Sequence, residues 1–392
     1  MGRFLRLFSF FAKLAVATVL APVIKLFDPS LRNVWIISER GNDARDNGFF
    51  FYQYMCQNHP EQPLWYIIDS KSPDFPKVAQ LGKWVEFESF RHYLFYALAK
   101  VRISSSLWGG DLPKMSYFKQ LRNKMGRRKK FIFLKHGIIK DYLPQHCYGE
   151  GYPDVYVCGA KPEYEYVKAN FGYPEGVVQY HGLARFDNLH NRETKRQILF
   201  MPTFRKWLPT MTREQIAESE YVKRWNEAIN DPRLVKLLEE NELELIFYPH
   251  HVMQKHVDMF RSPSARIKIA AFKDYDVQTL LIESKLLVTD FSSVFFDFGY
   301  MDKPVIYYQF DKEKYIKEHY DFTQGYFSYE DNGFGDVVYE EEGLYASIEK
   351  AVRGNLALEP KYKDRVDTFF PLKDQHNCQR IYQSILECIP ER

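Results

Sequence analysis

The sequence lacks paired cysteines. Its 392 residues contain five, at Cys56, Cys147, Cys158, Cys378 and Cys388. Their number is odd, they are spread along the chain, and no two form a Cys-x-x-Cys pair, which argues against a disulfide framework and against a cysteine-built zinc site. Repeats and low-complexity tracts are also missing. We therefore expect a folded protein with reduced thiols, and its length predicts two domains.

The apolar beginning of the chain lacks a long uncharged run. Its cations are Arg3, Arg6, Lys13 and Lys25. The longest uncharged run, residues 14–24, is shorter than the ~20 residues of a spanning helix. On a helix the first three cations fall on one side, which predicts an amphipathic membrane-surface helix over residues 1–28. A signal peptide, against which Lys13 argues, and a helix packed on the protein's own core are the alternatives.

Acidic residues are scarce in the first half of the chain. Residues 1–200 carry a net charge of +11 and residues 201–392 carry −8. Eight cations occur between residues 114 and 130 without an acid: Lys114, Lys119, Arg122, Lys124, Arg127, Arg128, Lys129 and Lys130. An anionic membrane surface attracts such a segment. A solvated loop is an alternative, and no nucleic-acid-binding module is visible. We predict peripheral attachment to the cytoplasmic side of the cell membrane.

Short apolar runs alternate with helical patterns from residue 33 onward. The expected strands are 34–38, 64–68, 101–104, 131–134 and 154–158, then 198–201, 243–248, 286–289 and 305–308. This alternation predicts parallel sheets with crossover helices. We expect two doubly wound Rossmann-like domains facing a cleft, at residues 29–190 and 191–392. The last helix, about 373–389, is expected to pack back on the first domain.

One predicted strand leads directly into two serines that open a helix. Asp290 and Phe291 precede Ser292 and Ser293. Main-chain N–H groups at a helix start, together with two hydroxyls, suit a phosphate. The alternative is that Ser292 is only an N-cap.

Histidines follow two other predicted strands. His136 stands before Gly137, which lets the backbone turn, and its ordinary pKa of ~6.5 suits a general base. A structural histidine is the alternative. His250 and His251 point to opposite sides as neighbours in the chain, so we predict no metal there; a hydrogen bond from His250 to a phosphate is the functional interpretation. Asp276 is expected to cap a helix rather than hold a metal.

Two arginines lie just past a strand or turn. Arg185 occurs in Gly182-Leu183-Ala184-Arg185-Phe186-Asp187, and Arg205 in Pro202-Thr203-Phe204-Arg205. The guanidinium fork suits a diphosphate, although surface arginines are common.

In this order, the motifs resemble those of the CDP-glycerol:glycerophosphate glycerophosphotransferase family of teichoic acid and capsule synthesis. The similar segments are Asp46-Asn47, His136-Gly137-Ile138-Ile139-Lys140, Gly182 to Asp187, Pro202 to Arg205, His250, Asp290 to Asp297, and Gln324-Gly325-Tyr326-Phe327. The chain departs from the family pattern at Ile139 and at His251. It also departs at Gln324, where the family has arginine.

The resemblance implies a two-domain GT-B fold and transfer of a polyol phosphate from CDP-glycerol or CDP-ribitol to an undecaprenyl-linked acceptor, with release of CMP. It implies catalytic roles for His136 and His250, with His136 as the base. The implied substrate-binding residues are Asn47, Lys140, Arg185, Arg205, Asp290, Ser292, Ser293, Asp297 and Gly325. No metal or cofactor is expected. The alternatives are a GT-B sugar transferase and a non-catalytic membrane scaffold.

Overall fold

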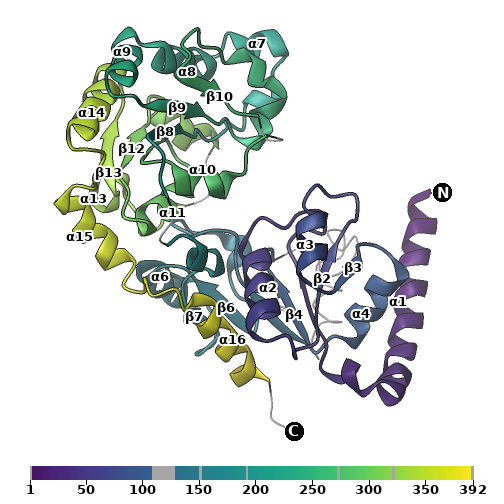
Figure 1. The fold of residues 1–392 in the computed structure, drawn as a ribbon. Helices are drawn as coiled ribbons and strands as arrows, with labels where there is room; N and C mark the ends of the chain where they lie inside the picture. Colours follow the sequence, from purple (N-terminus) through teal and green to yellow (C-terminus); the bar gives the residue numbers. More distant parts are fainter. Residues whose placement is uncertain are drawn as a thin grey trace. The chain divides into compact units, whose positions relative to one another are not determined.

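The computed structural model describes residues 2–107, 129–149, 152–190, 193–271, 274–319 and 323–389. The chain forms two compact α/β units (Figure 1). The first comprises Met1–Ile138, Pro144–Asn188 and Asp374–Arg392, and the second comprises Ile139–Leu143 and Leu189–Lys373. The predicted fold class, two doubly wound domains with an apolar helix at the beginning, is confirmed.

The first unit is built on a parallel sheet in the order β3-β2-β1-β4-β5-β6-β7. Its strands are β1 (Trp35–Ser38), β2 (Leu64–Ile68), β3 (Trp84–Glu86), β4 (Val101–Ser104), β5 (Lys130–Phe133), β6 (Val155–Cys158) and β7 (Val178–Tyr180). The strand order reverses between β1 and β4. In open α/β sheets, ligands bind at the carboxyl ends of the strands beside such a reversal.

Helices cover both faces of this sheet because successive strand residues point to opposite sides. Trp35 and Ile37 pack with α2 (Asn47–Asn58), α3 (Phe75–Leu81) and α16 (Asn377–Cys388). Ile36 packs on the other face with α1 (Gly2–Phe27) and α4 (Phe90–Leu98). Helix α6 (Lys161–Asn170) follows β6. Strands buried on both sides explain the continuous apolar runs in the sequence.

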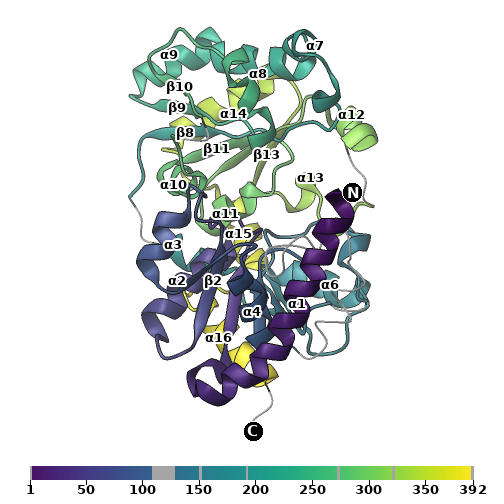
Figure 2. The same ribbon diagram turned by 90° about the vertical axis from the view of Figure 1, so that its right-hand side faces the viewer.

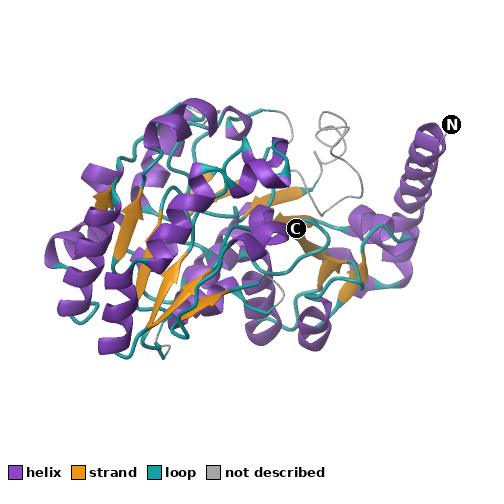
Figure 3. Cartoon of the chain, turned by 90° about the horizontal axis from the view of Figure 1, so that it is seen from above, coloured by secondary structure: helices purple, strands orange, loops and turns teal. Residues whose placement is uncertain are grey.

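The second unit repeats this plan in the order β10-β9-β8-β11-β12-β13, again parallel. Figure 3 shows strands in orange with helices in purple beside them. Its strands are β8 (Gln197–Phe200), β9 (Glu244–Phe247), β10 (Ile267–Ile269), β11 (Leu286–Thr289), β12 (Val305–Tyr308) and β13 (Gly335–Val338). Its helices are α7 (Arg213–Ala217), α8 (Glu220–Asn230), α9 (Pro232–Glu240), α10 (Val277–Glu283), α11 (Val294–Tyr300), α12 (Lys312–Lys314), α13 (Tyr329–Asn332), α14 (Glu341–Arg353) and α15 (Pro360–Phe369). The order reverses between β8 and β11.

The last helix belongs to the first unit. The Asp187 carboxylate accepts the N–H groups of Asn377 and Cys378, at 3.0 and 2.8 Å, where α16 begins. A carboxylate at this position satisfies free N–H groups and complements the helix dipole. The segment Ile139–Leu143 belongs to the second unit, which the predicted boundaries did not anticipate.

Helix α1 lies along α4 (Figure 2). Phe10, Leu14, Ala17 and Ala21 are buried in this contact, while other apolar side chains of α1 are exposed. By length and composition alone, Leu7–Phe27 could cross a membrane, contrary to the expectation from its uncharged run. A core helix can pass the same test, and 22 % of the apolar stretch is buried.

Of the basic cluster at 114–130, the structure describes two members. Lys129 is half-buried and donates to the carbonyl oxygens of Ala97 and Ala99, both at 2.9 Å, and burial lowers its pKa to about 7. Lys130 pairs with Asp154 at 2.9 Å. The other six cations lie outside the described residues.

Candidate functional site

In the first unit, His136 lies just beyond β5 with 75 % of its side chain exposed. Its Nδ1 atom is hydrogen-bonded to Oδ2 of Asp46, and this carboxylate raises the pKa of His136. A carboxylate at Nδ1 fixes the proton there and leaves the lone pair of a neutral ring on Nε2. The arrangement can therefore accept a proton at Nε2.

Asp46 is the N-cap of α2, where it accepts the main-chain N–H of Asn47 at 2.7 Å. Its Oδ1 atom also accepts from Nη1 of Arg185 at 3.0 Å. Burial favours the neutral acid, but His136, Arg185 and the N–H of Asn47 together hold the pKa of Asp46 below its ordinary value. The charged carboxylate is thus the form that meets His136. Asp46 belongs to one of the motifs that carry the family resemblance, but it was not among the predicted site residues.

Arg185 and Asn47 support the Asp46–His136 pair through hydrogen bonds. Arg185 binds Asp46 and also donates to the carbonyl oxygen of His136 at 2.5 Å. Asn47 is fully buried; its amide donates to the carbonyl oxygen of Lys135 at 2.9 Å and accepts the Arg185 N–H at 3.0 Å. Protein groups thus bond to both ends of the Asn47 amide, and its binding of substrate stays a prediction.

The backbone turns sharply before His136. Lys135 has a φ of 61°, in the left-handed region that a lysine rarely adopts. Its buried side chain forms an ion pair with Glu163, which also accepts the N–H of Gly159 at 2.7 Å. A strained residue persists where its surroundings hold it firmly. The buried pair therefore holds the turn that carries His136 into solvent.

A second buried carboxylate shapes the loop of Asp46. Glu39 accepts main-chain N–H groups from Arg45, Asp46 and Phe49, each at 2.9 Å. Burial and the neighbouring carboxylates of Asp46 and Asp43 raise its pKa to about 7. Glu39 was not among the predicted residues, because nothing in the sequence shows that it faces a loop.

Lys140 and Gly325 lie together in the second unit. The Lys140 ammonium is 2.6 Å from Asp141 and sits over the Tyr329 ring. A Cβ atom on Gly325 would lie 2.4 Å from the carbonyl oxygen of Lys140. Glycine is thus required by the close approach of two backbone segments, and Tyr142 N–H bonds to Thr323 O at 3.0 Å beside it. Gly325 has a packing role in this structure, and its contact with substrate stays a prediction.

Arg205, for which contact with a diphosphate stays a prediction, lies in the interior of the second unit. Its side chain has no solvent exposure. The guanidinium makes two bonds to Asp311, at 2.7 and 2.9 Å, pairs with Asp290 at 2.9 Å and donates to the Thr203 carbonyl at 2.5 Å. Two carboxylates raise its pKa despite burial. Arg205 is a buried structural cation, and Asp311 is a partner that the sequence did not reveal.

Asp290 is buried together with Arg205. One carboxylate oxygen accepts the N–H groups of Thr203 and Phe291, at 2.8 and 2.6 Å, and the other faces Arg205. Burial raises the pKa of Asp290. Asp290 therefore joins the loops that follow β8 and β11, and its contact with substrate stays a prediction.

The two serines after Asp290 lie closer to solvent. Ser293 is exposed and occupies the N-cap position of α11 without a capping bond from its side chain. The Ser292 hydroxyl accepts a long bond, 3.5 Å, from the Val294 N–H. Asp297 is buried in the first turn of the same helix. Of the predicted donor-side residues, the serines are therefore the ones most open to a ligand.

His250 lies beyond β9, on the same carboxyl-end edge of the sheet. Its Nδ1 atom accepts the Val252 N–H at 3.3 Å, and its ring stacks on Phe204 at 4.7 Å. Burial and the neighbouring His251 and His319 lower its pKa to about 4. The ring is neutral at physiological pH, with its proton on Nε2, where it can donate to an anion.

Other candidate sites carry less chemistry. Asp276 caps α10 by accepting the Thr279 N–H at 2.9 Å, as predicted. Among the residues that the structure describes, no group of three or more His, Cys, Asp or Glu residues could hold a metal ion.

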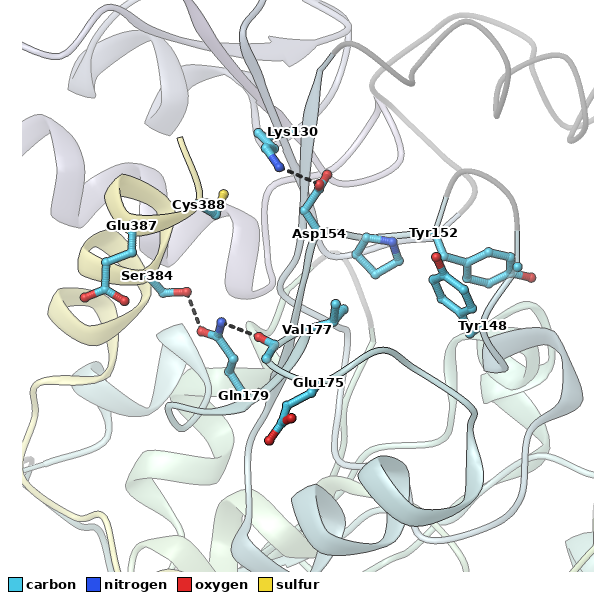
Figure 4. A pocket seen from close by; sticks show the side chains of 13 residues that line it. Lys130, Tyr148, Tyr152, Asp154, Glu175, Val177, Gln179, Ser384, Glu387 and Cys388 are labelled. Atoms are coloured by element: carbon cyan, nitrogen blue, oxygen red, sulfur yellow. Dashed lines mark hydrogen bonds and ion pairs between the residues drawn. The ribbon is translucent and has the colours of Figure 1, made fainter. Parts of the chain in front are cut away.

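A cavity of about 730 Å³ in the first unit lies at the amino ends of β5 to β7 (Figure 4). Lys130, Asp154 and Tyr152 line it, and none of the predicted site residues does.

Comparisons with known proteins agree with the motif order. A family profile described as CDP-Glycerol:Poly(glycerophosphate) glycerophosphotransferase matches residues 22–387. The minor teichoic acid biosynthesis protein GgaB of Bacillus subtilis (strain 168) is 33 % identical over 90 % of this chain and 40 % of its own length. The teichoic acid poly(glycerol phosphate) polymerase of that strain is 23 % identical over 89 % of this chain and 48 % of its own length. The chain thus spans less than half of either relative.

Solved structures support the fold. One structure of the wall teichoic acid polymerase TagF has a TM-score of 0.67 at 16 % identity, covering 97 % of this chain and 98 % of that chain. A second TagF structure, of a variant soaked with CDPG, has a TM-score of 0.64 at 16 % identity and covers 97 % and 94 %. At this identity the likeness establishes the architecture of two parallel-sheet domains.

Proposed function

Because the chain belongs to the CDP-glycerol:poly(glycerophosphate) glycerophosphotransferase family, we propose that it transfers a polyol phosphate from CDP-glycerol, or from CDP-ribitol, to a hydroxyl of an undecaprenyl-linked acceptor. Family membership makes the chain a transferase. The observation that carries the finer proposal is the exposed His136 imidazole, held at Nδ1 by the buried Asp46 carboxylate.

The first unit supplies the acceptor side in this proposal. Nε2 of His136 takes the proton of the acceptor hydroxyl as its oxygen attacks the phosphorus that carries the polyol. The new P–O bond forms, the P–O bond to CMP breaks, and CMP leaves with the electron pair. Asp46 stabilises the imidazolium that results. Such a reaction depends mainly on positioning and on stabilising charge.

The second unit supplies the donor side. The Nε2–H of His250 and the hydroxyls of Ser292 and Ser293 are suited to the pyrophosphate of the donor, because each can donate a hydrogen bond to an anionic oxygen. Arg205 and Asp290 support this edge from the interior. Loss of His250 is therefore expected to weaken donor binding more than it disturbs folding.

A substrate panel tests the proposal. The protein is incubated with a lipid-linked disaccharide and, separately, CDP-glycerol, CDP-ribitol or a UDP-sugar. CMP release from a CDP-polyol is expected, with a loss of about 10²–10⁴-fold in rate for His136→Ala. His376→Ala, which removes an exposed histidine elsewhere, is the matched control. Release of UDP alone would support the sugar-transferase alternative, and full activity of His136→Ala would leave the catalytic assignment without support.

We also propose that α1 lies on the anionic, cytoplasmic membrane surface. Its outer face exposes Phe8, Val19, Leu26 and Phe27, at 67, 71, 73 and 86 %, while the opposite face packs on α4. A helix held to its domain along one side is suited to lying in the interface. Co-sedimentation with vesicles of mixed anionic and neutral lipids should fall for Phe8→Glu/Val19→Glu and stay unchanged for Leu386→Glu, an exposed leucine of α16.

A further inference from the structure

Helix α2 begins with an N-cap whose side chain is directed away from the helix. An N-cap carboxylate ordinarily accepts the N–H of the second or third helical residue, because the first turn of a helix has no internal acceptors. In α2 these two residues are Gly48 and Phe49. The N-cap, Asp46, instead accepts the N–H of the first residue, Asn47, at 2.7 Å, and its Oδ2 atom faces His136. The second and third N–H groups therefore need other acceptors.

Side chains at two neighbouring strand ends supply these acceptors. Oε1 of Glu39, which directly follows β1, accepts the N–H groups of Phe49 and of Asp46 itself, both at 2.9 Å. Oγ of Ser105, which directly follows β4, accepts the Gly48 N–H at 2.7 Å. The Phe49 N–H also lies 2.9 Å from the Asp46 carbonyl oxygen, and such shared bonds are common where helices begin or end. Both N–H groups are thus satisfied without the Asp46 carboxylate.

The start of α2 lies directly against these two strand ends, and Gly48 permits the approach. A Cβ atom at Gly48 would lie 2.9 Å from Cγ of Glu39 and 3.2 Å from Oγ of Ser105. Both acceptor side chains are buried. The sheet order reverses between β1 and β4, the place where ligands bind in open α/β sheets. The capping bonds therefore lie in the interior, directly behind the edge that carries Asp46 and His136.

We propose that Glu39 and Ser105 are positioning residues, which bind the N–H groups in the first turn of α2 and so keep the Asp46 carboxylate directed at His136. Without these acceptors, the Asp46 side chain would rotate to the N–H of Gly48 or Phe49, because a buried N–H without a partner is costly. The bond to His136 would then be lost. The effect on the rate rests on the proposed function, in which His136 is the base, whereas the effect on the ring itself does not.

Two capping variants test this role. Glu39→Met removes both carboxylate oxygens with little change in size, and Ser105→Ala removes the hydroxyl without changing any charge. Asp74→Asn is the matched control. Buried Asp74 accepts the Ala44 N–H at 3.2 Å and the Arg45 guanidinium at 2.8 and 2.9 Å, so its bonds hold the same loop ahead of Asp46.

The first measurement is the pKa of the His136 ring, by nuclear magnetic resonance titration, with the signal assigned by its absence in His136→Ala. Asp46 raises this pKa, while Arg185 and Arg40 lower it. We expect the pKa to fall in both capping variants, because the carboxylate turns away from the ring, and to stay unchanged in the matched control. A fall in Ser105→Ala cannot come from a lost charge.

The titration overturns the inference in either of two cases: an unchanged His136 pKa in both capping variants, or an equal fall in the Asp74→Asn control. Thermal unfolding shows which variants are folded. If Glu39→Met does not fold, Ser105→Ala decides alone.

The second measurement is the rate of CMP release from CDP-glycerol. We expect kcat to fall by roughly 10- to 100-fold in Glu39→Met, as for a displaced catalytic group, and by less in Ser105→Ala, with the KM for CDP-glycerol nearly unchanged. Because Ser105 acts through Asp46, adding Ser105→Ala to Asp46→Asn should lower kcat no further. A further fall would overturn the inference. If the unaltered chain released no CMP, the proposed function would fail, and the His136 titration would still decide the role of Glu39 and Ser105.

Discussion

The imidazole of His136 is held through its Nδ1 atom by the carboxylate of Asp46, 90 residues earlier in the chain. Both residues lie beyond the carboxyl ends of strands of one parallel sheet, Asp46 in the loop between β1 and α2 and His136 just after β5. The main chain fixes the carboxylate, through the N–H of Asn47, and Arg185 fixes it from the side. The pair therefore has the orientation of a base and its positioning carboxylate.

Replacing Asp46 by asparagine should remove most of the activity without unfolding the protein. The amide oxygen of the new side chain would stay with Arg185 and the Asn47 N–H, and its NH₂ would face Nδ1 of His136. The ring would then carry its proton on Nε2, where it cannot act as a base. We expect kcat to fall by about 10²–10⁴-fold, with little change in the KM for CDP-glycerol.

Asp43→Asn is the matched control for Asp46→Asn, since Asp43 lies on the same loop and pairs with Arg40. It should keep nearly full activity. Equal losses in the two variants would point to a general disturbance of the loop, and an unchanged kcat in Asp46→Asn would rule out a role of the carboxylate in catalysis.

The pH dependence of kcat/KM should report the charges around His136. The neutral ring is the base, so the rate falls as pH drops through its pKa. Asp46 raises that pKa, and Arg185 and Arg40 lower it. Asp46→Asn should therefore move the acidic limb of the profile to lower pH, and Arg40→Gln should move it to higher pH. Shifts of the same sign in both variants would contradict this electrostatic account.

Arg205→Met should destabilise the second unit. The substitution leaves the buried carboxylates of Asp290 and Asp311 without their cation, and breaking a buried ion pair on one side costs about 3–5 kcal/mol. For a domain of this size that corresponds to a fall of roughly 10 °C in Tm. Arg213→Met, at an exposed arginine, should change Tm little. Weaker donor binding at an unchanged Tm would instead indicate that Arg205 contacts the ligand.

Much of the fold follows from the sequence, because strands buried on both faces leave long apolar runs. The longer central strands, such as β2 and β11, lie where the runs predict them. The strands β3, β7, β10 and β13 went unrecognised. Each has three or four residues and lies at an edge of its sheet, where neither length nor hydrophobicity distinguishes a strand from a loop.

The position of a candidate site residue was predictable where a residue type and its place at a strand end coincide, as at His136, His250 and Ser293. It was not predictable where function depends on a partner distant in the chain. Asp311 is 106 residues from Arg205, so the sequence could not show that this guanidinium forms ion pairs with buried carboxylates. For the same reason, the motif that contains Asp46 did not show that this carboxylate bonds to His136.

Gly325→Ala should be destabilising because of a single backbone contact. A Cβ atom at this position would lie 2.4 Å from the Lys140 carbonyl oxygen and 2.8 Å from Cα of Asp141. Main-chain atoms cannot move aside as a flexible side chain does, so the segment Ile139–Leu143 would have to separate from residues 323–326. We expect a loss of about 1–3 kcal/mol, measured by denaturant unfolding.

Gly343→Ala is the control for Gly325→Ala. Gly343 lies inside α14, and a Cβ atom there would meet only the Val338 side chain, at an ordinary 3.4 Å. Alanine favours a helix over glycine, so this variant should be neutral or slightly more stable. Because Ile139 directly follows the loop of His136, Gly325→Ala should also lower kcat, whereas Gly343→Ala should not. Equal stability of the two variants would show that the close approach of the two backbones is not required.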